Sequence, residues 1–356
     1  MFTSKKIPGR LAQTGDLVLL ILFVTTAGLI SCKTRSVVRQ IEPAFYFWKS
    51  VFTLSDFEKK KLDSLQVKTI YLKFFDVDWN EELKKPKPLA TIRITDSAYK
   101  DFSIIPTVFI TNACIQKIDS GQVKELADHL MGLLKGILAD HQFKEIPEIQ
   151  FDCDWTGSTR EKYFTLLKES RALMPNAKLS ATIRLHQVKY MSKSGIPPVD
   201  RGLLMCYNMG NLKNPATKNS ILETEELKKY IGGLSGYPLP LDIGLPLFNW
   251  KVLYRDNVYA GLLQNIPETV FARSLAKKTG NRYDILKDTL LQGYELRKGD
   301  LIRDEQSNIK ELLATASEIS SRLKNTALRV SLYHLDSLIL RKYPNHDLES
   351  IYNSLH

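Results

Sequence analysis

Short apolar runs alternate with amphipathic segments along most of this chain. The apolar runs have the length of buried strands, and the amphipathic segments repeat their apolar residues every three or four positions, as helices do. The predicted strands cover residues 44–48, 68–75, 104–115, 147–155, 178–185, 203–208, 241–248 and 328–332. The predicted helices cover residues 55–65, 121–140, a segment after Ser158, a segment around Leu227, and residues 309–323 and 345–355.

Eight strands that mostly alternate with helices indicate parallel pairing. We therefore predict an α/β fold, a (β/α)8 TIM barrel over residues 43–356. A doubly wound open sheet is the alternative, although the chain has no G-x-G-x-x-G or P-loop motif to support a nucleotide-binding fold. Residues 251–325 are too long for one connection, so we predict an insertion between strands seven and eight that ends in a barrel helix.

Two helix starts carry a capping-box signature, in which a serine is followed three residues later by a glutamate. The pairs are Ser55 with Glu58, and Ser158 with Glu161. The second pair comes directly after the strand at 147–155. This stretch therefore predicts the strand-to-helix step of an α/β fold.

The first 31 residues have the pattern of a bacterial lipoprotein signal peptide. A basic segment containing Lys5, Lys6 and Arg10 precedes an uncharged, mostly apolar stretch at 17–30, which is shorter than the roughly 20 residues of a membrane span. The following Leu-Ile-Ser-Cys resembles a lipobox, with Cys32 as the lipidated residue. An ordinary signal peptide or an uncleaved anchor is the alternative.

Residues 32–42 are polar and basic, and we predict that they tether the barrel to the lipid. Acyl chains would hold the protein on a membrane without spanning it. We therefore expect a location in the bacterial cell envelope, on the outer membrane or the cell surface, with the membrane as one partner.

The formal charge of +11 does not indicate a nucleic-acid partner. The basic residues are scattered, and Lys59–Lys61 is their longest run. Scattered charge of this kind is typical of a solvated surface. We expect no nucleic acid to bind.

The other cysteines, Cys114, Cys153 and Cys206, each lie in an apolar run. We expect them to be small buried hydrophobic residues. No Cys or His spacing resembles a zinc site, and we predict neither a metal nor a cofactor.

The fourth predicted strand ends in two acids, within P-E-I-Q-F-D-C-D-W at 147–155. Side chains alternate along a strand, so Asp152 and Asp154 share a face. Two like charges at one strand end are costly to bury, and a functional site is the usual reason to tolerate them.

A closely similar pentad, F-D-V-D-W at 75–79, ends the second predicted strand and supplies Asp76 and Asp78. The two pentads are either equivalent strand ends or a coincidence. In the same strand, Lys73 points into the barrel with Phe75 or outward with Phe74, and the pattern does not decide between them.

Three strand ends together resemble the chitinase-like glycoside hydrolases of family 18. That family carries D-x-x-D-x-D-x-E on strand four, M-x-Y-D on strand six and G-[I/L]-P-x-Y/F near strand seven. This chain has Asp152-Cys153-Asp154-Trp155-Thr156, then Met205-Cys206-Tyr207-Asn208, then Gly244-Leu245-Pro246-Leu247-Phe248. The resemblance covers most of residues 44–340, as short motifs in the family's order.

The chain departs from the family pattern at three positions. The general-acid Glu falls at Thr156, the first Asp of the motif falls at Ile149, and the strand-six Asp is Asn208. A threonine cannot protonate a leaving group at neutral pH. The resemblance therefore implies either a sugar-binding relative without catalysis or a glycoside hydrolase with a rearranged acid.

The resemblance implies that Asp154 and Tyr207 contact the acetamido group of an amino sugar. With Asp152 and Asn208 they form the predicted catalytic set, and Asp76 or Asp78 is the candidate for a carboxylate on another strand. Further predicted substrate contacts, from strand ends and aromatic faces, are Arg184, His186, Trp155, Trp250 and Tyr333. For each, an ordinary structural role is the alternative, such as an ion pair between Arg184 and an aspartate.

We predict a membrane-anchored, glycoside-hydrolase-like barrel that acts on or binds an amino-sugar glycan. The alternative is a non-catalytic envelope lipoprotein that binds a glycan or a protein.

Overall fold

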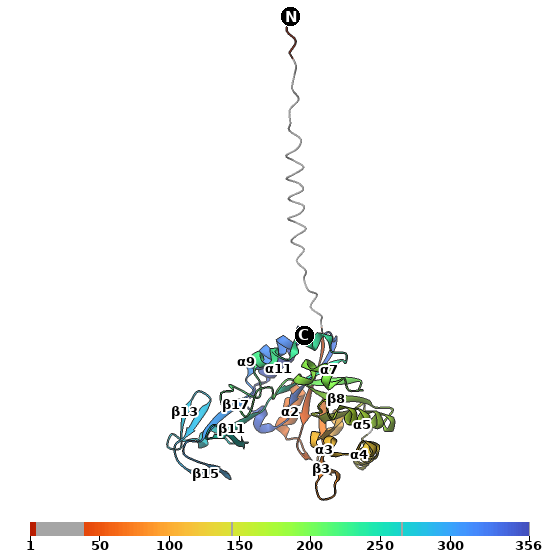
Figure 1. Cartoon of the computed structure of the whole chain (residues 1–356), viewed down its shortest axis with the longest axis vertical. Helices are drawn as coiled ribbons and strands as arrows, with labels where there is room; N and C mark the ends of the chain where they lie inside the picture. The colour runs from red at the N-terminus through yellow and green to blue at the C-terminus, as the bar shows by residue number, and fades with distance from the viewer. Residues whose placement is uncertain (5–38, 144, 265, 356) are drawn as a thin grey trace. The chain divides into compact units, whose positions relative to one another are not determined.

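Eight parallel strands close into a barrel in the computed structural model, which describes residues 1–4, 39–143, 145–264 and 266–355 (Figure 1). The barrel lies in the compact unit from Arg39 to His356. The strand order is β1-β18-β10-β9-β8-β7-β6-β3, and pairing of β1 with β3 completes the circle. The strands are β1 (Gln40–Phe47), β3 (Thr69–Asn80), β6 (Ser103–Ile110), β7 (Glu148–Cys153), β8 (Lys178–Arg184), β9 (Arg201–Met205), β10 (Leu241–Pro246) and β18 (Ala327–Tyr333). The predicted TIM-barrel fold is confirmed.

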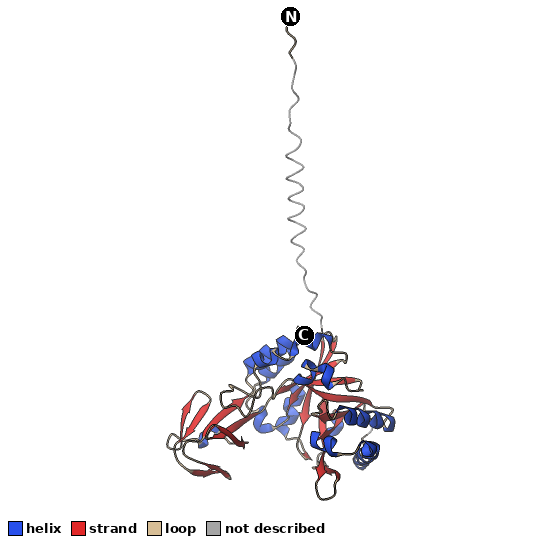
Figure 2. Cartoon of the chain, in the orientation of Figure 1, coloured by secondary structure: helices blue, strands red, loops and turns tan. Residues whose placement is uncertain are grey.

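Helices follow most of the barrel strands and cover them from outside (Figure 2). They are α2 (Asp56–Ser64), α3 (Asn112–Lys117), α4 (Val123–Asp140), α5 (Arg160–Leu173), α6 (Leu185–Lys189), α7 (Met191–Ser194), α8 (Thr224–Lys228), α9 (Ile309–Ser320), α10 (Ser337–Leu340) and α11 (Asn345–Asn353). Short 3-10 helices are η1 (Ser97–Asp101), η2 (Ser120–Gln122), η3 (Ile231–Gly236) and η4 (Glu268–Val270).

The apolar stripes of these helices make the outer core. In α4, Val123, Leu126, Leu130 and Leu134 are buried, as the helical spacing predicts. The capping box of α2 forms with both of its hydrogen bonds, between Ser55 and Glu58.

Two predicted boundaries are wrong for local reasons. The third strand was expected to run to residue 115, but β6 ends at Ile110 because Thr111 caps α3 by accepting a hydrogen bond from the Cys114 N–H. The capping box predicted at Ser158 does not form, since α5 begins at Arg160 with Thr159 as its N-cap.

The segment between β10 and β18 builds a separate antiparallel sheet of five strands, ordered β12-β11-β17-β14-β13. Its strands are β11 (Asn249–Arg255), β12 (Val258–Leu263), β13 (Ala276–Thr279), β14 (Arg282–Ile285) and β17 (Leu301–Gln306). A hairpin of β15 (Thr289–Leu291) and β16 (Tyr294–Leu296) lies within it. This sheet has its own apolar cluster, which includes Leu253, Tyr283 and Ile302. Figure 1 shows these strands gathered at one side of the barrel.

Smaller strands extend the barrel rim. β4 (Lys85–Leu89) pairs antiparallel with the end of β3, and β2 (Val51–Phe52) pairs with β5 (Arg93–Ile94).

A bulge in β3 decides the direction of Lys73. The pairing of β3 with β6 shifts between Lys73 and Phe75, so Phe74 and Phe75 both join the outer core. Lys73 and Asp76 then both face the barrel interior, where their side chains form an ion pair of 2.9 Å.

The N-terminal end of the barrel is filled by charged side chains. Arg329 contacts Glu42 at 2.9 Å and Glu148 at 3.0 Å, and Arg201 contacts Asp242 at 3.2 Å. Burial raises the pKa of Asp242 to about 6, although Arg201 and Arg329 oppose this.

The signal-peptide prediction falls on residues outside the described part of the chain, and so does Cys32. The predicted tether reaches residue 42, whereas β1 already begins at Gln40. Within the described residues, no helix has the length and apolar character needed to cross a membrane.

Candidate functional site

A cavity of about 610 Å³ opens at the C-terminal ends of the barrel strands. This is the end where TIM barrels carry their active sites. Charged groups, amides and aromatic rings line it together. They are Trp48, Lys49, Phe109, Asp152, Arg184, Met205, Tyr207, Asn208, Phe248, Asn249, Trp250, Gln264, Tyr333, His334, Asp336 and Ile339.

Arg184 contacts two aspartates at the end of β7, Asp152 within the strand and Asp154 directly after it. Its Nη2 lies 3.6 Å from Oδ1 of Asp152, and its Nε donates to Oδ1 of Asp154. Asp152 also accepts a 2.6 Å hydrogen bond from the hydroxyl of Thr182. One guanidinium therefore serves two carboxyl groups.

The two aspartates differ in their surroundings. The Asp152 side chain is 4% exposed, whereas that of Asp154 is 54% exposed. Burial raises the pKa of Asp152, opposed by Arg184 and by the hydrogen bond from Thr182. Burial disfavours the charge on Arg184, but Asp152 and Asp154 outweigh it and raise the pKa of the guanidinium.

The backbone around Arg184 is held by a buried glutamine. Arg184 ends β8 and caps α6, and its N–H donates to Oε1 of Gln187 at 2.8 Å. The Nε2 of Gln187 donates to the carbonyl of Trp155 at 2.9 Å. This bridge fixes the end of β8 against the residues that follow β7.

The two similar pentads occupy equivalent strand ends. In the registers of the barrel, Asp76 of β3 and Asp152 of β7 are both paired with Phe109 of β6. Paired residues of neighbouring strands face the same side, so both carboxyl groups flank Phe109 on the cavity side. Two strand spacings separate their Cα atoms, about 10 Å.

Asp78 has a structural partner. Its Oδ1 accepts hydrogen bonds from the hydroxyl of Thr111 at 2.6 Å and from the backbone N–H of Trp79 at 2.8 Å. Asp78 thereby supports the turn that leads into α3.

Stacked tyrosines form one wall of the cavity. The rings of Tyr207 and Tyr333 stack at 5.6 Å, and Phe248 meets both edge-on. The Tyr207 hydroxyl is buried and has no hydrogen-bond partner among the described residues. Burial also raises the pKa of Tyr207 well above its ordinary value. Tyr207 therefore offers a neutral hydroxyl beside Arg184.

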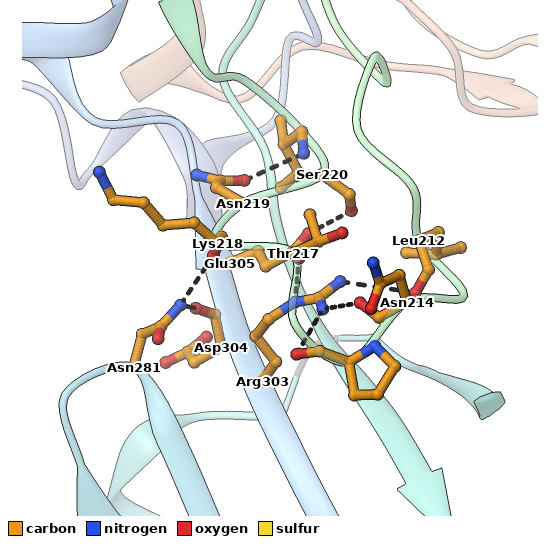
Figure 3. A network of polar contacts seen from close by, with 12 residues as sticks. Leu212, Asn214, Thr217, Lys218, Asn219, Ser220, Asn281, Arg303, Asp304 and Glu305 are labelled. Atoms are coloured by element: carbon orange, nitrogen blue, oxygen red, sulfur yellow. Dashed lines mark hydrogen bonds and ion pairs between the residues drawn. The ribbon is translucent and has the colours of Figure 1, made fainter. Parts of the chain in front are cut away.

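Trp250 is held by the buried network that Figure 3 shows in part. Its Nε1 donates to Oε2 of Glu305 at 2.7 Å, and the Ser220 hydroxyl donates to the same oxygen at 2.5 Å. Glu305 also pairs with Arg303 at 2.5 Å, and the side chains of both are fully buried.

Arg303 extends this network to the loop between β9 and α8. Its guanidinium donates to the carbonyls of Asn214 at 2.7 Å and Leu212 at 3.5 Å (Figure 3). The guanidinium also lies over the ring of Tyr254. Hydrogen bonds therefore connect the antiparallel sheet to this loop and to Trp250 in the cavity wall.

Trp155 does not face the cavity. Its ring is 0% exposed, stacks on Tyr163 at 5.2 Å and donates from Nε1 to the carbonyl of Ser194 at 2.8 Å. The expected role of Trp155 as a sugar-stacking ring has no support here, because no face of the ring is open.

A second, smaller cavity of about 200 Å³ adjoins the first along Arg184 and Tyr207. It is lined in addition by Asp154, His186 and Asn208. Burial lowers the pKa of His186, so this imidazole is neutral at pH 7. Asn208 is a non-glycine residue with a positive φ of 55°, which asparagine tolerates better than most residues.

Thr156 supplies no acid at the position of the family's glutamate. It is exposed, and its hydroxyl lies 2.9 Å from that of Ser158. Among the described residues, no group of three or more His, Cys, Asp or Glu side chains is arranged to hold a metal ion.

The structure brings most of the predicted site residues to one end of the barrel. Asp152, Arg184, Tyr207, Asn208, Trp250 and Tyr333 line the large cavity, Asp154 and His186 line the small one, and Asp76 flanks Phe109. Trp155 and Asp78 lie in structural positions instead.

Sequence reasoning missed one charged pair at the rim. Lys49 and Asp336 line the large cavity and form an ion pair of 2.8 Å, while Asp336 also caps α10. Burial opposes the charge of Asp336, but Lys49 outweighs it and lowers the pKa of this carboxyl. Lys49 directly follows the predicted strand 44–48, and Asp336 comes four residues after the predicted strand 328–332, so the closeness to strand ends was the available signal.

Trp48 and Phe109 were missed as lining residues as well. Aromatic residues in apolar runs look the same whether they face a core or a cavity. Glu305 was missed because it lies in a segment without a predicted fold.

No family model and no curated protein matches this sequence. Solved structures match its fold. The spore cortex-lytic enzyme SleL of Bacillus cereus superposes with a TM-score of 0.51 at 14% identity, covering 88% of this chain and 74% of that one. SleL of Bacillus megaterium gives a TM-score of 0.52 at 13% identity, with coverage of 88% and 74%.

A chitinase from Chromobacterium violaceum matches over nearly its whole length. The TM-score is 0.51 at 11% identity, covering 88% of this chain and 97% of the chitinase. The shared feature is the closed barrel of eight parallel strands. The chain therefore has a TIM-barrel fold that is similar to the folds of this chitinase and of the two SleL enzymes.

Proposed function

We propose that this barrel binds an amino-sugar glycan in the cavity at its strand ends and does not hydrolyse it by the family's mechanism. The fold neighbours include a chitinase and two spore cortex-lytic enzymes, which supports a polymeric glycan as the ligand. A volume of about 610 Å³ lies in the usual range of ligand pockets, about 300–1,000 Å³.

The cavity walls suit a sugar. Aromatic rings such as Tyr333 and Trp250 provide apolar faces, and Asn208 and the Tyr207 hydroxyl provide polar contacts. Buried polar groups without a partner are costly, so a ligand hydroxyl or amide that reaches Tyr207 stabilises the complex.

One observation carries the proposal of binding without the family's chemistry. Arg184 engages both Asp152 and Asp154, while Thr156 occupies the position of the acid. Asp154 is therefore paired with a cation of the protein, and the threonine at the position of the family's acid cannot protonate a leaving group.

Hydrolysis by a different pair of carboxyl groups is the second candidate function. It is favoured by the positions of Asp76 and Asp152, which lie on either side of Phe109 in the barrel sheet. Inverting glycosidases hold their two carboxyl groups about 6.5–9.5 Å apart. Side chains that converge from Cα atoms about 10 Å apart can reach that separation. Asp152, whose pKa burial raises, would be the acid, and Asp76 would be the base.

One panel separates the two candidates. Oligomers of N-acetylglucosamine, peptidoglycan fragments and acidic polysaccharides are offered to the wild-type chain and to Asp154→Asn, Asp152→Asn and Asp76→Asn. We expect binding without turnover, weakened by Asp154→Asn. Turnover that both Asp152→Asn and Asp76→Asn abolish would establish the rearranged hydrolase instead.

Lipidation at Cys32 is the second part of the proposal, and it places the barrel on the envelope membrane. Its support is the lipobox-like Leu-Ile-Ser-Cys after a basic and an apolar segment. Labelled palmitate should be incorporated by the wild type but not by Cys32→Ser. Equal labelling of both would exclude this residue as the anchor.

A further inference from the structure

Among the described residues, carboxyl groups outnumber cations at the floor of the two adjoining cavities, where Asp152 lines the large cavity, Asp154 lines the small one and Asp76 flanks Phe109. Asp76, Asp152 and Asp154 come from two strand ends, and they share Lys73 and Arg184 as ion-pair partners. The other described charged pair at this rim, Lys49 with Asp336, is already matched. The floor therefore has one carboxyl group more than its cations can balance.

The excess of carboxyl groups over cations is also seen in the contacts of the individual aspartates. Oδ1 of Asp76 is buried without a hydrogen-bond partner among the described residues. Asp76 and Asp154 both act on Asp152 to disfavour its ionised form, in addition to burial. A further cation close to these three groups would relieve all of them at once.

An independent observation indicates a ligand at the same place. The Tyr207 side chain is 5% exposed and lines both cavities, and its hydroxyl has no partner among the described residues. The hydroxyl lies within electrostatic range of Arg184 and Asp152. It is a buried polar atom, on a residue that lines both cavities, to which the described part of the chain supplies no hydrogen-bond partner.

We propose that the cavity selects amino sugars with a free, protonated amine, so that glucosamine units bind in preference to N-acetylglucosamine units. This inference rests on the proposed glycan-binding function and names the ligand class for the same site. The ammonium group would lie beside Asp154 and Asp152, and the Tyr207 hydroxyl would accept a hydrogen bond from the sugar.

The aromatic walls are compatible with a cation. Lys73 already places its ammonium 5.7 Å from the ring centre of Trp48, which lines the same cavity. Aromatic faces attract cations within about 6 Å. An acidic sugar is disfavoured, because Arg184 and Lys49 are both occupied by aspartates.

The net charge of +11 on the chain opposes the approach of a cationic ligand from a distance. At physiological ionic strength this long-range effect decays over about 8 Å, whereas contacts at the cavity floor are screened much less. The preference should therefore be seen in affinity at ordinary salt concentration rather than in the association rate.

The test is calorimetric titration of the full-length chain in a neutral detergent at pH 6. The two ligands are the trimers of glucosamine and of N-acetylglucosamine, which differ only in acetylation. We expect the glucosamine trimer to bind about tenfold more tightly, which corresponds to about 1.4 kcal/mol. Asp154→Asn should remove this preference, because it leaves the floor with balanced charges.

Asp256→Asn is the matched control, since Asp256 is exposed in the turn between β11 and β12 and the same charge is removed away from the cavity. It should retain the preference, and both variants should keep the thermal unfolding midpoint of the wild type. Asp154 is 54% exposed, so its replacement is compatible with folding.

Each outcome decides a different question. Equal or tighter binding of the N-acetylglucosamine trimer would overturn the charge preference and leave the glycan-binding function intact. An unchanged preference in Asp154→Asn would overturn the assignment of this preference to the carboxyl groups at the cavity floor. Failure of both trimers to bind would remove the proposed function itself, and the preference with it.

Discussion

The two ends of this barrel hold the same kind of charge cluster in different surroundings. At the N-terminal end, Glu42, Glu148 and Asp242 share Arg201 and Arg329. At the C-terminal end, three aspartates share Lys73 and Arg184. Each cluster therefore has three carboxyl groups and two cations.

The surplus carboxyl group is accommodated differently at each end. At the N-terminal end the Asp242 side chain is 1% exposed, and the raised pKa of about 6 lets a proton neutralise it. At the C-terminal end burial also raises the pKa of Asp152, but this residue lines a cavity of about 610 Å³, where a ligand can approach. The extra carboxyl group is thus part of the packed interior at the N-terminal end, whereas at the C-terminal end it is accessible to a ligand.

Removing an arginine should have the largest effect, and it should differ between the two ends. Arg329→Met leaves Glu148 buried without its closest cation, and breaking a buried pair costs about 3–5 kcal/mol. Arg184→Met should cost less, because solvent can replace the guanidinium at the half-exposed Asp154, and the buried Asp152 keeps its hydrogen bond from Thr182. Urea denaturation measures both free energies of unfolding.

Arg297→Met is the control, because it removes an exposed ion pair with Glu295 that is worth about 1 kcal/mol or less. If Arg184→Met were as costly as Arg329→Met, the distinction between a packed end and an open end would be wrong.

Asp242 should make stability depend on pH in a characteristic direction. Its folded pKa of about 6 exceeds the unfolded value of about 3.9, so the folded chain binds more protons between these values. This group therefore stabilises the fold at low pH, and about 3 kcal/mol of that contribution is lost as pH rises from about 4 to about 6.

The measurement is the difference in unfolding free energy between the wild type and Asp242→Asn across this pH range. The difference should fall steadily as pH rises, because Asp242→Asn lacks the titrating group. A difference that stays constant would mean that Asp242 keeps an ordinary pKa and that Arg201 and Arg329 balance the N-terminal cluster.

Much of the fold could be predicted from apolar periodicity alone. All eight barrel strands lie close to the predicted ranges, because each crosses a core that demands a continuous apolar run. The ends were less accurate, as at Thr111, since capping by one hydroxyl is a local contact that periodicity does not reveal. The five-stranded sheet was not predicted strand by strand, because its strands are short and its surface is largely polar.

The sequence predicted which residues lie at the candidate site, but not which of their side chains contact one another. Strand ends placed Asp152, Arg184 and Tyr207 at one face, since parallel strands end together. The bulge that turns both Lys73 and Asp76 inward could not be read from the sequence. The burial of Trp155 was missed for a related reason, because alternation alone does not distinguish a cavity wall from the layer beneath the helices.

A third prediction concerns the wall contributed by the antiparallel sheet. Glu305→Gln removes the buried charge that pairs with Arg303, but the glutamine oxygen can still accept a hydrogen bond, so the cost should lie below that of a fully broken buried pair, about 3–5 kcal/mol. The substitution should also loosen Trp250, so the affinity for a glycan should fall while the Asp154-dependent preference remains. Titration of Glu305→Gln and Glu311→Gln provides the comparison, because the carboxylate of Glu311 accepts its hydrogen bonds from Thr224 and does not line the large cavity.

Loss of affinity in both variants would indicate a general effect on stability. Retained affinity in Glu305→Gln would show that the orientation of Trp250 is not needed for binding.

The smallest expected effect on stability belongs to Asp154→Asn. Because Asp154 is half exposed, its ion pair with Arg184 should change the unfolding free energy by about 1 kcal/mol or less. The substitution should nevertheless change the free energy of glycan binding more than the free energy of unfolding. Ligand titration measures the first and urea denaturation the second, on the same sample. A large loss of stability with unchanged binding would assign Asp154 a purely structural role.

The most direct test of the site is a crystal structure of the chain with a saturating glucosamine oligomer. We expect a sugar ring in the cavity at the strand ends, between Tyr207 and Trp250, with its amine beside Asp154. An empty cavity, or an oligomer bound elsewhere on the barrel, would contradict the assignment of this end as the glycan site.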